Sequence, residues 1–186
     1  MERRYLESYN TNSCENKNFD VVIIGAGIAG LYTALMLSKN LRVAVLSKKD
    51  VYDCDSYLAQ GGVAASIEND DRELHVKDTI NAGCYVNDLE AVNVLVNESE
   101  KAINDLVRLG VGFDKNSQGN FYRSFEGNHS IPRILHVNGD STGKAIMEVL
   151  VNQAKNTSNI EIIPNIFALD IVDNKNKYCG IMTFYK

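Results

Sequence analysis

The segment Phe19–Leu31, FDVVIIGAGIAGL, decides the fold of this chain because it joins a strand, a glycine-rich turn and the start of a helix. The apolar run from Val21 to Ile24 is typical of a buried parallel strand. Three glycines follow at the spacing G-x-G-x-x-G, and residues 31–39 continue with helical periodicity. Because the glycines lie between a strand and a helix, the segment predicts a dinucleotide-binding site rather than an ordinary turn.

Each glycine of this turn has a physical task. Gly25 permits the tight turn, Gly27 lets the backbone approach a pyrophosphate, and Gly30 allows the helix to pack closely against the strand. The helix N-terminus offers N–H donors and the positive end of its dipole to the phosphates. A second strand, expected over residues 41–46, completes a strand–helix–strand unit and predicts an α/β fold.

The end of the second strand does not carry the acidic residue that usually binds the ribose of NAD. Ser47 and Lys48 stand there instead. A serine hydroxyl can still bond a ribose, and a lysine can lie near phosphate. This departure argues against an ordinary NAD dehydrogenase without deciding the cofactor.

The next informative segment is Asp55–Gly62, DSYLAQGG. The backbone of Gly61 and Gly62 can lie flat against a planar ligand, with Ser56 and Gln60 as polar contacts. An ordinary polar loop has a similar composition. The residues alone therefore leave both interpretations open.

The order of strand, G-A-G-I-A-G, helix, strand, S-K and S-Y-L-A-Q-G-G resembles the succinate dehydrogenase/fumarate reductase flavoprotein family, most closely its L-aspartate oxidase branch. The resemblance implies FAD as cofactor. In respiratory members a histidine four residues before A-Q-G-G carries the flavin covalently; Asp55 occupies that place, which implies non-covalent FAD. The resemblance assigns cofactor binding to Gly25, Ala26, Gly27, Ile28, Ala29, Gly30, Lys48, Asp55, Ser56, Tyr57, Leu58, Ala59, Gln60, Gly61 and Gly62.

Three further segments extend the resemblance. Residues 75–83 are similar to the family's H-V-x-D-T-x-x-A-G helix, on which His75, Asp78 and Thr79 share a face. We expect that face to serve packing and capping rather than catalysis. Residues 126–136 resemble E-G-x-H-S-x-x-R-I-L-H of the L-aspartate oxidase branch, and residues 139–143 resemble the family's D-x-T-G helix entry.

Glu126 is the candidate catalytic residue, with a role in substrate orientation. The resemblance implies transfer of a hydride from the Cα of L-aspartate to the flavin. A carboxylate near the substrate can pair with the α-ammonium group, which succinate lacks. The alternative is a surface glutamate in a glycine-rich loop. His129 and His136 fit packing as well as catalysis.

The expected architecture is α/β, a Rossmann-like FAD-binding domain whose N-terminal half is present, with an antiparallel β-meander at the C-terminal end. The meander is expected from residues 160–163, 166–172 and 179–185. Residues 1–18 are expected to form a flexible leader and residues 19–186 a partial FAD-binding domain, without the family's capping and C-terminal helical domains. We therefore expect an N-terminal portion of a longer protein, inactive alone.

The remaining elements follow from periodicity and capping residues. Helices are expected over residues 73–84 and 143–155, the latter capped by Ser141 or Asp140. A long helix is expected to end at Leu109, with Asp88 as N-cap and Gly110 as its stop. Residues 112–122 predict a hairpin with its turn at residues 116–119. The apolar stripe expected in the core consists of Val92, Leu95, Val96, Ile103, Leu106 and Val107.

Composition excludes several classes of function. A net charge of −5 does not favour binding to nucleic acid or to acidic lipid, which are themselves negatively charged. The sequence has no apolar run of about 18 residues and no secretory signal, so we expect no membrane association and a cytoplasmic location. The four cysteines are scattered, which predicts neither a zinc site nor a disulfide framework. No metal ligands are expected.

The resemblance implies L-aspartate as substrate, oxygen or fumarate as acceptor, and iminoaspartate as product. Iminoaspartate leads through quinolinate to NAD, so handover to quinolinate synthase is a possible partnership. Two alternatives remain open. One is a fumarate reductase or succinate dehydrogenase flavoprotein, and the other is a non-catalytic nucleotide-binding module.

Overall fold

The computed structural model describes residues 14–67, 71–174 and 177–185. The chain divides into two compact units. Unit 1 comprises residues 1–55 and 150–186, and unit 2 comprises residues 56–149. Each unit is described by itself.

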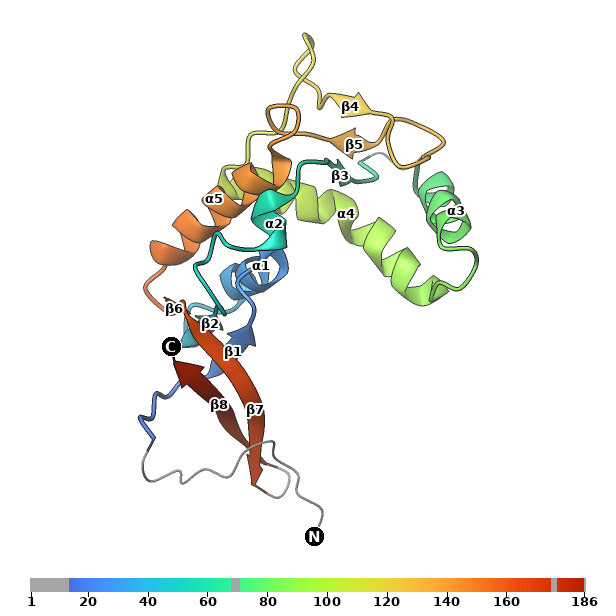
Figure 1. Ribbon diagram of the computed structural model, residues 1–186. Helices are drawn as coiled ribbons and strands as arrows, with labels where there is room; N and C mark the ends of the chain where they lie inside the picture. The colour runs from blue at the N-terminus through green and yellow to red at the C-terminus, as the bar shows by residue number, and fades with distance from the viewer. Residues whose placement is uncertain (1–13, 68–70, 175–176, 186) are drawn as a thin grey trace. The chain divides into compact units, whose positions relative to one another are not determined.

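Unit 1 is built on a parallel sheet with the strand order β1-β2-β6 (Figure 1). Strand β1 spans Val21–Ile24, β2 spans Val43–Leu46 and β6 spans Ile160–Ile163. All four residues of the central strand β2 are buried, and helix α1 (Ile28–Met36) follows β1. The strand–helix–strand unit predicted from the glycine turn is thus confirmed.

The position of β6 corrects one expectation, because residues 160–163 were expected in the antiparallel meander. They pair in parallel with β2, with Val43 opposite Ile160. The physical reason is the helix before them, α5 (Thr142–Lys155). A helical crossover returns the chain in the direction of the earlier strand, which makes the next pairing parallel.

The other two predicted strands do pair antiparallel. Strand β7 (Ile166–Asn174) and strand β8 (Lys177–Tyr185) form a two-stranded hairpin (Figure 1). The register places Phe167 opposite Phe184, and both side chains are exposed. The hairpin confirms the antiparallel C-terminal element, with two strands rather than three.

Unit 2 combines helices with a small antiparallel sheet of order β3-β5-β4. Helix α2 (Asp55–Leu58) begins at Asp55, which is the residue just before unit 2 starts at residue 56. The strands and helices that follow are β3 (Val63–Ala64), α3 (Arg72–Ala82), α4 (Leu89–Leu109), β4 (Arg123–Ser124), β5 (Ile134–Leu135) and the first part of α5. The segment predicted as a hairpin contains a turn, closed by the N–H of Gly119 donating to the Asn116 carbonyl at 3.0 Å, and one bridge between Lys115 and Phe121.

The ends of α4 agree with the predicted capping residues. Asp88 Oδ1 accepts a hydrogen bond from the Ala91 N–H at 3.1 Å. Gly110 ends the helix with φ +113°, a left-handed conformation that favours glycine. Its N–H donates to the carbonyl of Leu106.

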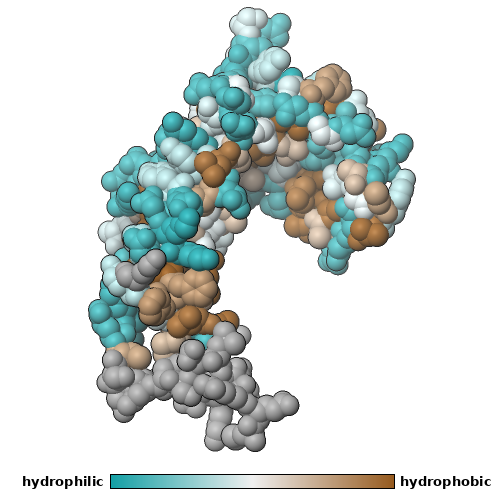
Figure 2. Space-filling view, in the orientation of Figure 1, coloured by the Kyte–Doolittle hydropathy of each residue, from teal (hydrophilic) through white to brown (hydrophobic). Residues whose placement is uncertain are grey.

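The apolar stripe of α4 is narrower than predicted. Val92, Val96, Ile103 and Leu106 are buried, whereas Leu95 is 58% exposed and Val107 is 40% exposed. At 3.6 residues per turn, these two residues lie about 60° to either side of Val92, on the flanks of the stripe. Hydrophobic side chains are visible at the surface where α3 and α4 lie (Figure 2). Within the described ranges, no helix combines the length and apolar character needed to cross a membrane.

Candidate active site

The glycine-rich turn of unit 1 connects the end of β1 to the start of α1. Gly25 has φ +112°, which side chains rarely adopt. A Cβ atom on Gly30 would lie 1.9 Å from the Gly25 carbonyl oxygen and 3.3 Å from Ile23 Cγ2, so only glycine permits this approach of helix to turn. Gly27 is the N-cap residue and has no side chain to cap the helix. The turn therefore brings the start of the helix close to the glycine loop, the arrangement expected of a pyrophosphate-binding turn.

The other predicted cofactor residues of unit 1 lie in different surroundings. Ala26 is buried, and Ile28 and Ala29 form the first positions of α1. Lys48 lies two residues after the end of β2, and its Nζ lies 5.1 Å from the centre of the Phe167 ring, a cation–π contact. Asp55 is exposed at the start of α2.

In unit 2, the two glycines of the flavin loop (residues 56–62) have opposite surroundings. A Cβ atom on Gly62 would lie 2.3 Å from Ile134 Cγ2 and 2.4 Å from the Leu135 carbonyl oxygen. Packing against β5 therefore demands glycine at this position. A Cβ atom on Gly61 would meet no atom within 4 Å, so the protein's own packing leaves this position open.

The first part of the flavin loop packs on the N-terminus of α5. The Gly143 N–H donates to the Ala59 carbonyl at 3.0 Å, and a Cβ on Gly143 would lie 2.2 Å from the Ser56 carbonyl oxygen. Tyr57 contacts Glu148 through its hydroxyl at 3.5 Å. Leu58 is 69% exposed. The D-x-T-G motif thus serves this close approach, a role that its spacing alone did not reveal.

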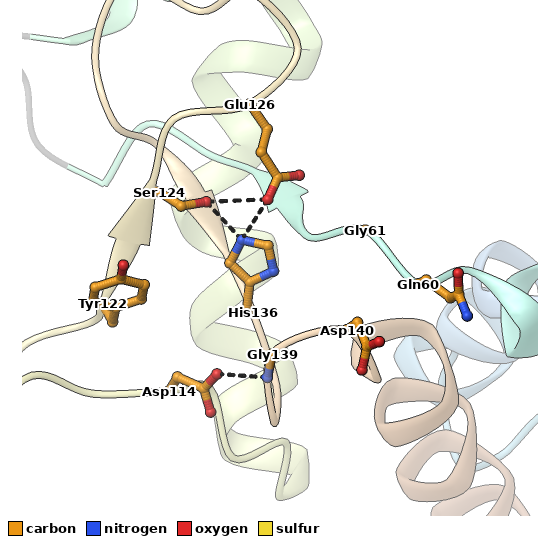
Figure 3. Close-up of a pocket in the computed structure, with 9 residues that line it drawn as sticks. All are labelled: Gln60, Gly61, Asp114, Tyr122, Ser124, Glu126, His136, Gly139 and Asp140. Atoms are coloured by element: carbon orange, nitrogen blue, oxygen red, sulfur yellow. Dashed lines mark hydrogen bonds and ion pairs between the residues drawn. The ribbon is translucent and has the colours of Figure 1, made fainter.

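The structure brings the candidate Glu126 together with two residues of the flavin loop. Glu126, Gln60 and Gly61 line one cavity of about 560 Å³ (Figure 3). The other lining residues are Asp114, Tyr122, Ser124, His136, Gly139 and Asp140. Three of the lining side chains are carboxylates, and among the described residues that line the cavity there is neither lysine nor arginine. The cavity is therefore suited to a cationic group.

Glu126 forms a cluster with Ser124 of β4 and with His136 beside β5. Glu126 Oε1 lies 3.2 Å from His136 Nε2 and 3.3 Å from Ser124 Oγ. Ser124 Oγ and His136 Nε2 lie 2.7 Å apart. His136 is 8% exposed, whereas the Glu126 side chain is 49% exposed. A buried histidine thus supports a carboxylate that reaches the cavity.

A second polar cluster is buried and lies behind the loop that carries Glu126. Arg133 is fully buried; its Nη2 lies 2.7 Å from Asp71 Oδ1 and its Nη1 lies 3.3 Å from Asp78 Oδ2. The Ser130 N–H donates to Asp78 Oδ2 at 2.8 Å. These contacts fasten the loop to α3, in agreement with the structural role expected for the residue 75–83 helix.

Burial sets the ionisation of this cluster. Burial raises the pKa of Asp71 against the opposing charge of Arg133. Burial, together with the nearby Arg133 and His129, lowers the pKa of His75 to about 4, and Ser66 Oγ lies 2.9 Å from His75 Nδ1. Burial also opposes ionisation of Asp78, but hydrogen bonds from Ser130 and the Arg133 charge outweigh it, so the pKa of Asp78 is lowered.

Sequence reasoning did not identify several cavity residues. Ser124 lies in a short polar segment that no motif marks. Asp114 accepts hydrogen bonds from the N–H groups of Asn138 at 3.0 Å and Gly139 at 3.1 Å, which holds a turn with φ +49° and +74° against the cavity. The sequence Asn138-Gly139 is typical of a turn. Its partner Asp114, however, lies 24 residues earlier in the chain, so the sequence did not reveal the contact.

Comparison with known families defines the class of protein. A family model described as "FAD binding domain" matches residues 20–184, so the chain belongs to the FAD-binding domain family. FAD is thus confirmed as the cofactor that the sequence indicated. The chain is 44% identical to the L-aspartate oxidase of Clostridium acetobutylicum over 161 residues, 87% of this chain and 37% of that protein. It is 42% identical to the L-aspartate oxidase of Nostoc sp. over 90% of this chain and 29% of that protein.

The chain therefore spans about a third of the length of the curated relatives it matches.

Solved structures that resemble this chain belong to succinate dehydrogenase and fumarate reductase flavoproteins. The Sdh1 complex of Mycobacterium smegmatis in the apo form matches 90% of this chain and 31% of its own, with a TM-score of 0.81 and 28% identity. The quinol fumarate reductase FrdA of E. coli matches 89% of this chain and 29% of its own, with a TM-score of 0.81 and 25% identity. The resemblance to L-aspartate oxidases and the succinate dehydrogenase/fumarate reductase flavoproteins is confirmed.

Proposed function

We propose that this chain forms the FAD-binding part of an L-aspartate oxidase, which oxidises L-aspartate to iminoaspartate with oxygen or fumarate as acceptor. The observation that carries the proposal is the acidic cavity in which Glu126 meets Gln60 and Gly61 of the flavin loop. The similarity to curated L-aspartate oxidases supports the choice of substrate.

The residues of the chain fit FAD in two ways. The N–H groups at the start of α1 would hold the pyrophosphate, because Gly25 and Gly30 bring turn and helix close together. Gly61 gives the flavin ring an open backbone surface. The chemistry that bound FAD would supply is acceptance of a hydride from the substrate. Asp55 replaces the linkage histidine, so the cofactor is held without a covalent bond.

Glu126 selects the amino acid by pairing with its α-ammonium group. Asp114 and Asp140 add negative charge to the same cavity, and its lining in the described chain contains no lysine or arginine that would attract the substrate carboxylates. The cavity therefore receives the ammonium end of L-aspartate. Succinate and fumarate have no ammonium group and gain nothing from Glu126.

The product places the protein in the first step of de novo NAD biosynthesis. Iminoaspartate is an unstable imine that water hydrolyses, so rapid transfer to a quinolinate synthase would protect it. Residues 19–186 act in this proposal as one part of the FAD-binding domain.

The substitution Glu126→Gln tests the role of the carboxylate. In the complete enzyme of which this chain would be the FAD-binding part, loss of a charge-assisted contact of about 1.5–3 kcal/mol corresponds to a fall of roughly 10- to 150-fold in kcat/KM for L-aspartate. Fumarate reduction by the same FAD-loaded protein should change little. Both half-reactions are measured in the variant and in Glu98→Gln, a control on an exposed face of α4. An equal loss on both substrates would assign Glu126 a structural role.

Fumarate reduction or succinate oxidation is the second candidate function. The likeness to succinate dehydrogenase and fumarate reductase structures favours it. It predicts turnover of succinate without turnover of L-aspartate. A protein that binds FAD and turns over neither substrate would instead be a nucleotide-binding module.

A further inference from the structure

The carboxylate of Glu126 uses only one of its oxygens within the described chain. Oε1 contacts both Ser124 Oγ and His136 Nε2. In Figure 3 the other oxygen points away from these two partners. The side chain is therefore held from one side, while Oε2 remains for a ligand.

The direction of the hydrogen bonds follows from the buried side of His136. Its Nδ1 is buried and has no hydrogen-bond partner among the described residues. A proton on Nδ1 would create a buried donor without an acceptor, which costs more than an unpaired acceptor and is rare in proteins. The neutral ring therefore carries its proton on Nε2, where Ser124 and Glu126 lie.

This tautomer gives each atom of the cluster one consistent role. His136 Nε2–H donates to Ser124 Oγ at 2.7 Å, and the Ser124 hydroxyl donates to Glu126 Oε1 at 3.3 Å. The chain of donors ends at a carboxylate, which accepts only. The opposite order would leave the carboxylate facing a bare ring nitrogen at 3.2 Å.

We propose that His136, acting through Ser124, is a positioning residue that presents Glu126 Oε2 to the ammonium group of the substrate. The inference rests on the proposed function and deepens it, because it makes selectivity for an amino acid depend on the residue that holds Glu126 in place. A glutamate that is already ordered loses less side-chain freedom when the ligand binds. We expect this ordering to contribute roughly 3- to 10-fold of the preference for L-aspartate over succinate.

The tautomer can be tested without substrate or activity. The chain contains three histidines, so long-range ¹H–¹⁵N correlation spectra of the imidazole rings at mildly alkaline pH are simple to read. His136→Gln assigns the ring that disappears. We expect the His136 proton on Nε2. A His136 ring with a bare Nε2 would overturn the proposal.

Selectivity is tested by the ratio of the Kd of succinate to the Kd of L-aspartate, followed by the flavin absorbance of the FAD-loaded protein. His136→Leu and Ser124→Ala should lower the ratio roughly 3- to 10-fold. His136→Gln should retain most of it, because its amide nitrogen can donate near the place of Nε2. Ser99→Ala, which removes a hydrogen bond to the Ser66 N–H in unit 2 away from the cavity, is the control for lost stability. An unchanged ratio in His136→Leu, or an equal fall in Ser99→Ala, would overturn the proposal.

A double-mutant cycle separates this inference from the proposed function. Glu126→Gln without effect on the ratio would refute the pairing of Glu126 with the ammonium group. If the Kd ratio falls in Glu126→Gln but not in His136→Leu, only the positioning role of His136 is refuted. If His136 acts through Glu126, the double variant has the ratio of Glu126→Gln alone. Additive losses would contradict this.

Discussion

Two adjacent glycines, Gly61 and Gly62, have opposite surroundings. Gly62 lies against β5 so closely that a Cβ atom would overlap Ile134 and the Leu135 carbonyl. Gly61 has open space around it, so nothing within the described protein requires glycine there. We expect that a ligand lying flat on the backbone is the reason for glycine at this position.

This difference predicts the behaviour of Gly61→Val. The new side chain fits the protein but occupies the surface proposed for the flavin, so FAD affinity should fall by roughly 10-fold or more, as expected for an overpacked contact. The matched control is Gly112→Val, because Gly112 also has open space and no positive φ. FAD titration by fluorescence quenching measures both. Equal affinities in the two variants would remove Gly61 from the cofactor site.

Asp55 leads to a second prediction at the residue scale. Because an aspartate carboxylate stands at the place of the linkage histidine, FAD bound by this protein should be released on acid or heat denaturation. The denatured polypeptide is run on a gel and viewed for flavin fluorescence. Fluorescence that travels with the polypeptide would show a covalent bond and contradict the prediction.

Among the elements, α4 has both of its ends determined by local chemistry. The Asp88 side chain accepts from the Ala91 N–H, and Gly110 adopts the left-handed conformation that ends the helix. These interactions involve residues close in the sequence. That is why the helix boundaries followed from the sequence, while the exposure of Leu95 and Val107 did not.

Removal of either cap should destabilise the protein by a similar amount. Asp88→Ala should cost about 1 kcal/mol of unfolding free energy, and Gly110→Ala should cost about the same because its φ is unfavourable for alanine. Asn97→Ala, an exposed change within α4, is the control and should be neutral or slightly stabilising. Urea denaturation measures all three. A cost of Asp88→Ala no larger than that of the control would show that the cap is not needed.

At the scale of the molecule, the buried charges of unit 2 link its stability to pH. Arg133 holds Asp71 and Asp78, and His75 and His129 lie edge to face with ring centres 5.3 Å apart. The cluster thus ties α3 to the loop before β5. We therefore expect a change in the protonation of one member to affect the stability of unit 2.

His75 predicts a specific window of pH-dependent stability. Its pKa falls from 6.5 in the unfolded chain to about 4 in the folded protein, so the unfolded state binds more protons between these values. Stability is therefore complete above pH 6.5 and falls as the pH drops toward 4, by roughly 3 kcal/mol at most. The raised pKa of Asp71 acts in the opposite sense, because the folded state takes up that proton more readily.

The variant His75→Gln isolates this contribution, since Asp71, Asp78, His129 and Arg133 stay in place. Urea unfolding is measured from pH 4 to 7 for both proteins, and the variant should have the flatter dependence on pH. If the unfolding free energies of the two proteins change in parallel with pH, His75 is not responsible for the loss of stability at low pH.

The sequence by itself determined the features that depend on neighbours along the chain. The strand–turn–helix at Gly25–Gly30 and the caps of α4 followed from short motifs, because φ angles, capping and helical periodicity are local properties. The cofactor followed from the resemblance that several motifs carry together, and the family match confirms it. The tertiary structure decided what depends on distant partners. It placed β6 in the parallel sheet, joined Ser130 to Asp78 across 52 residues, and brought Ser124 and His136 to Glu126. Such contacts form only when the whole unit closes around its core, so no local pattern could specify them.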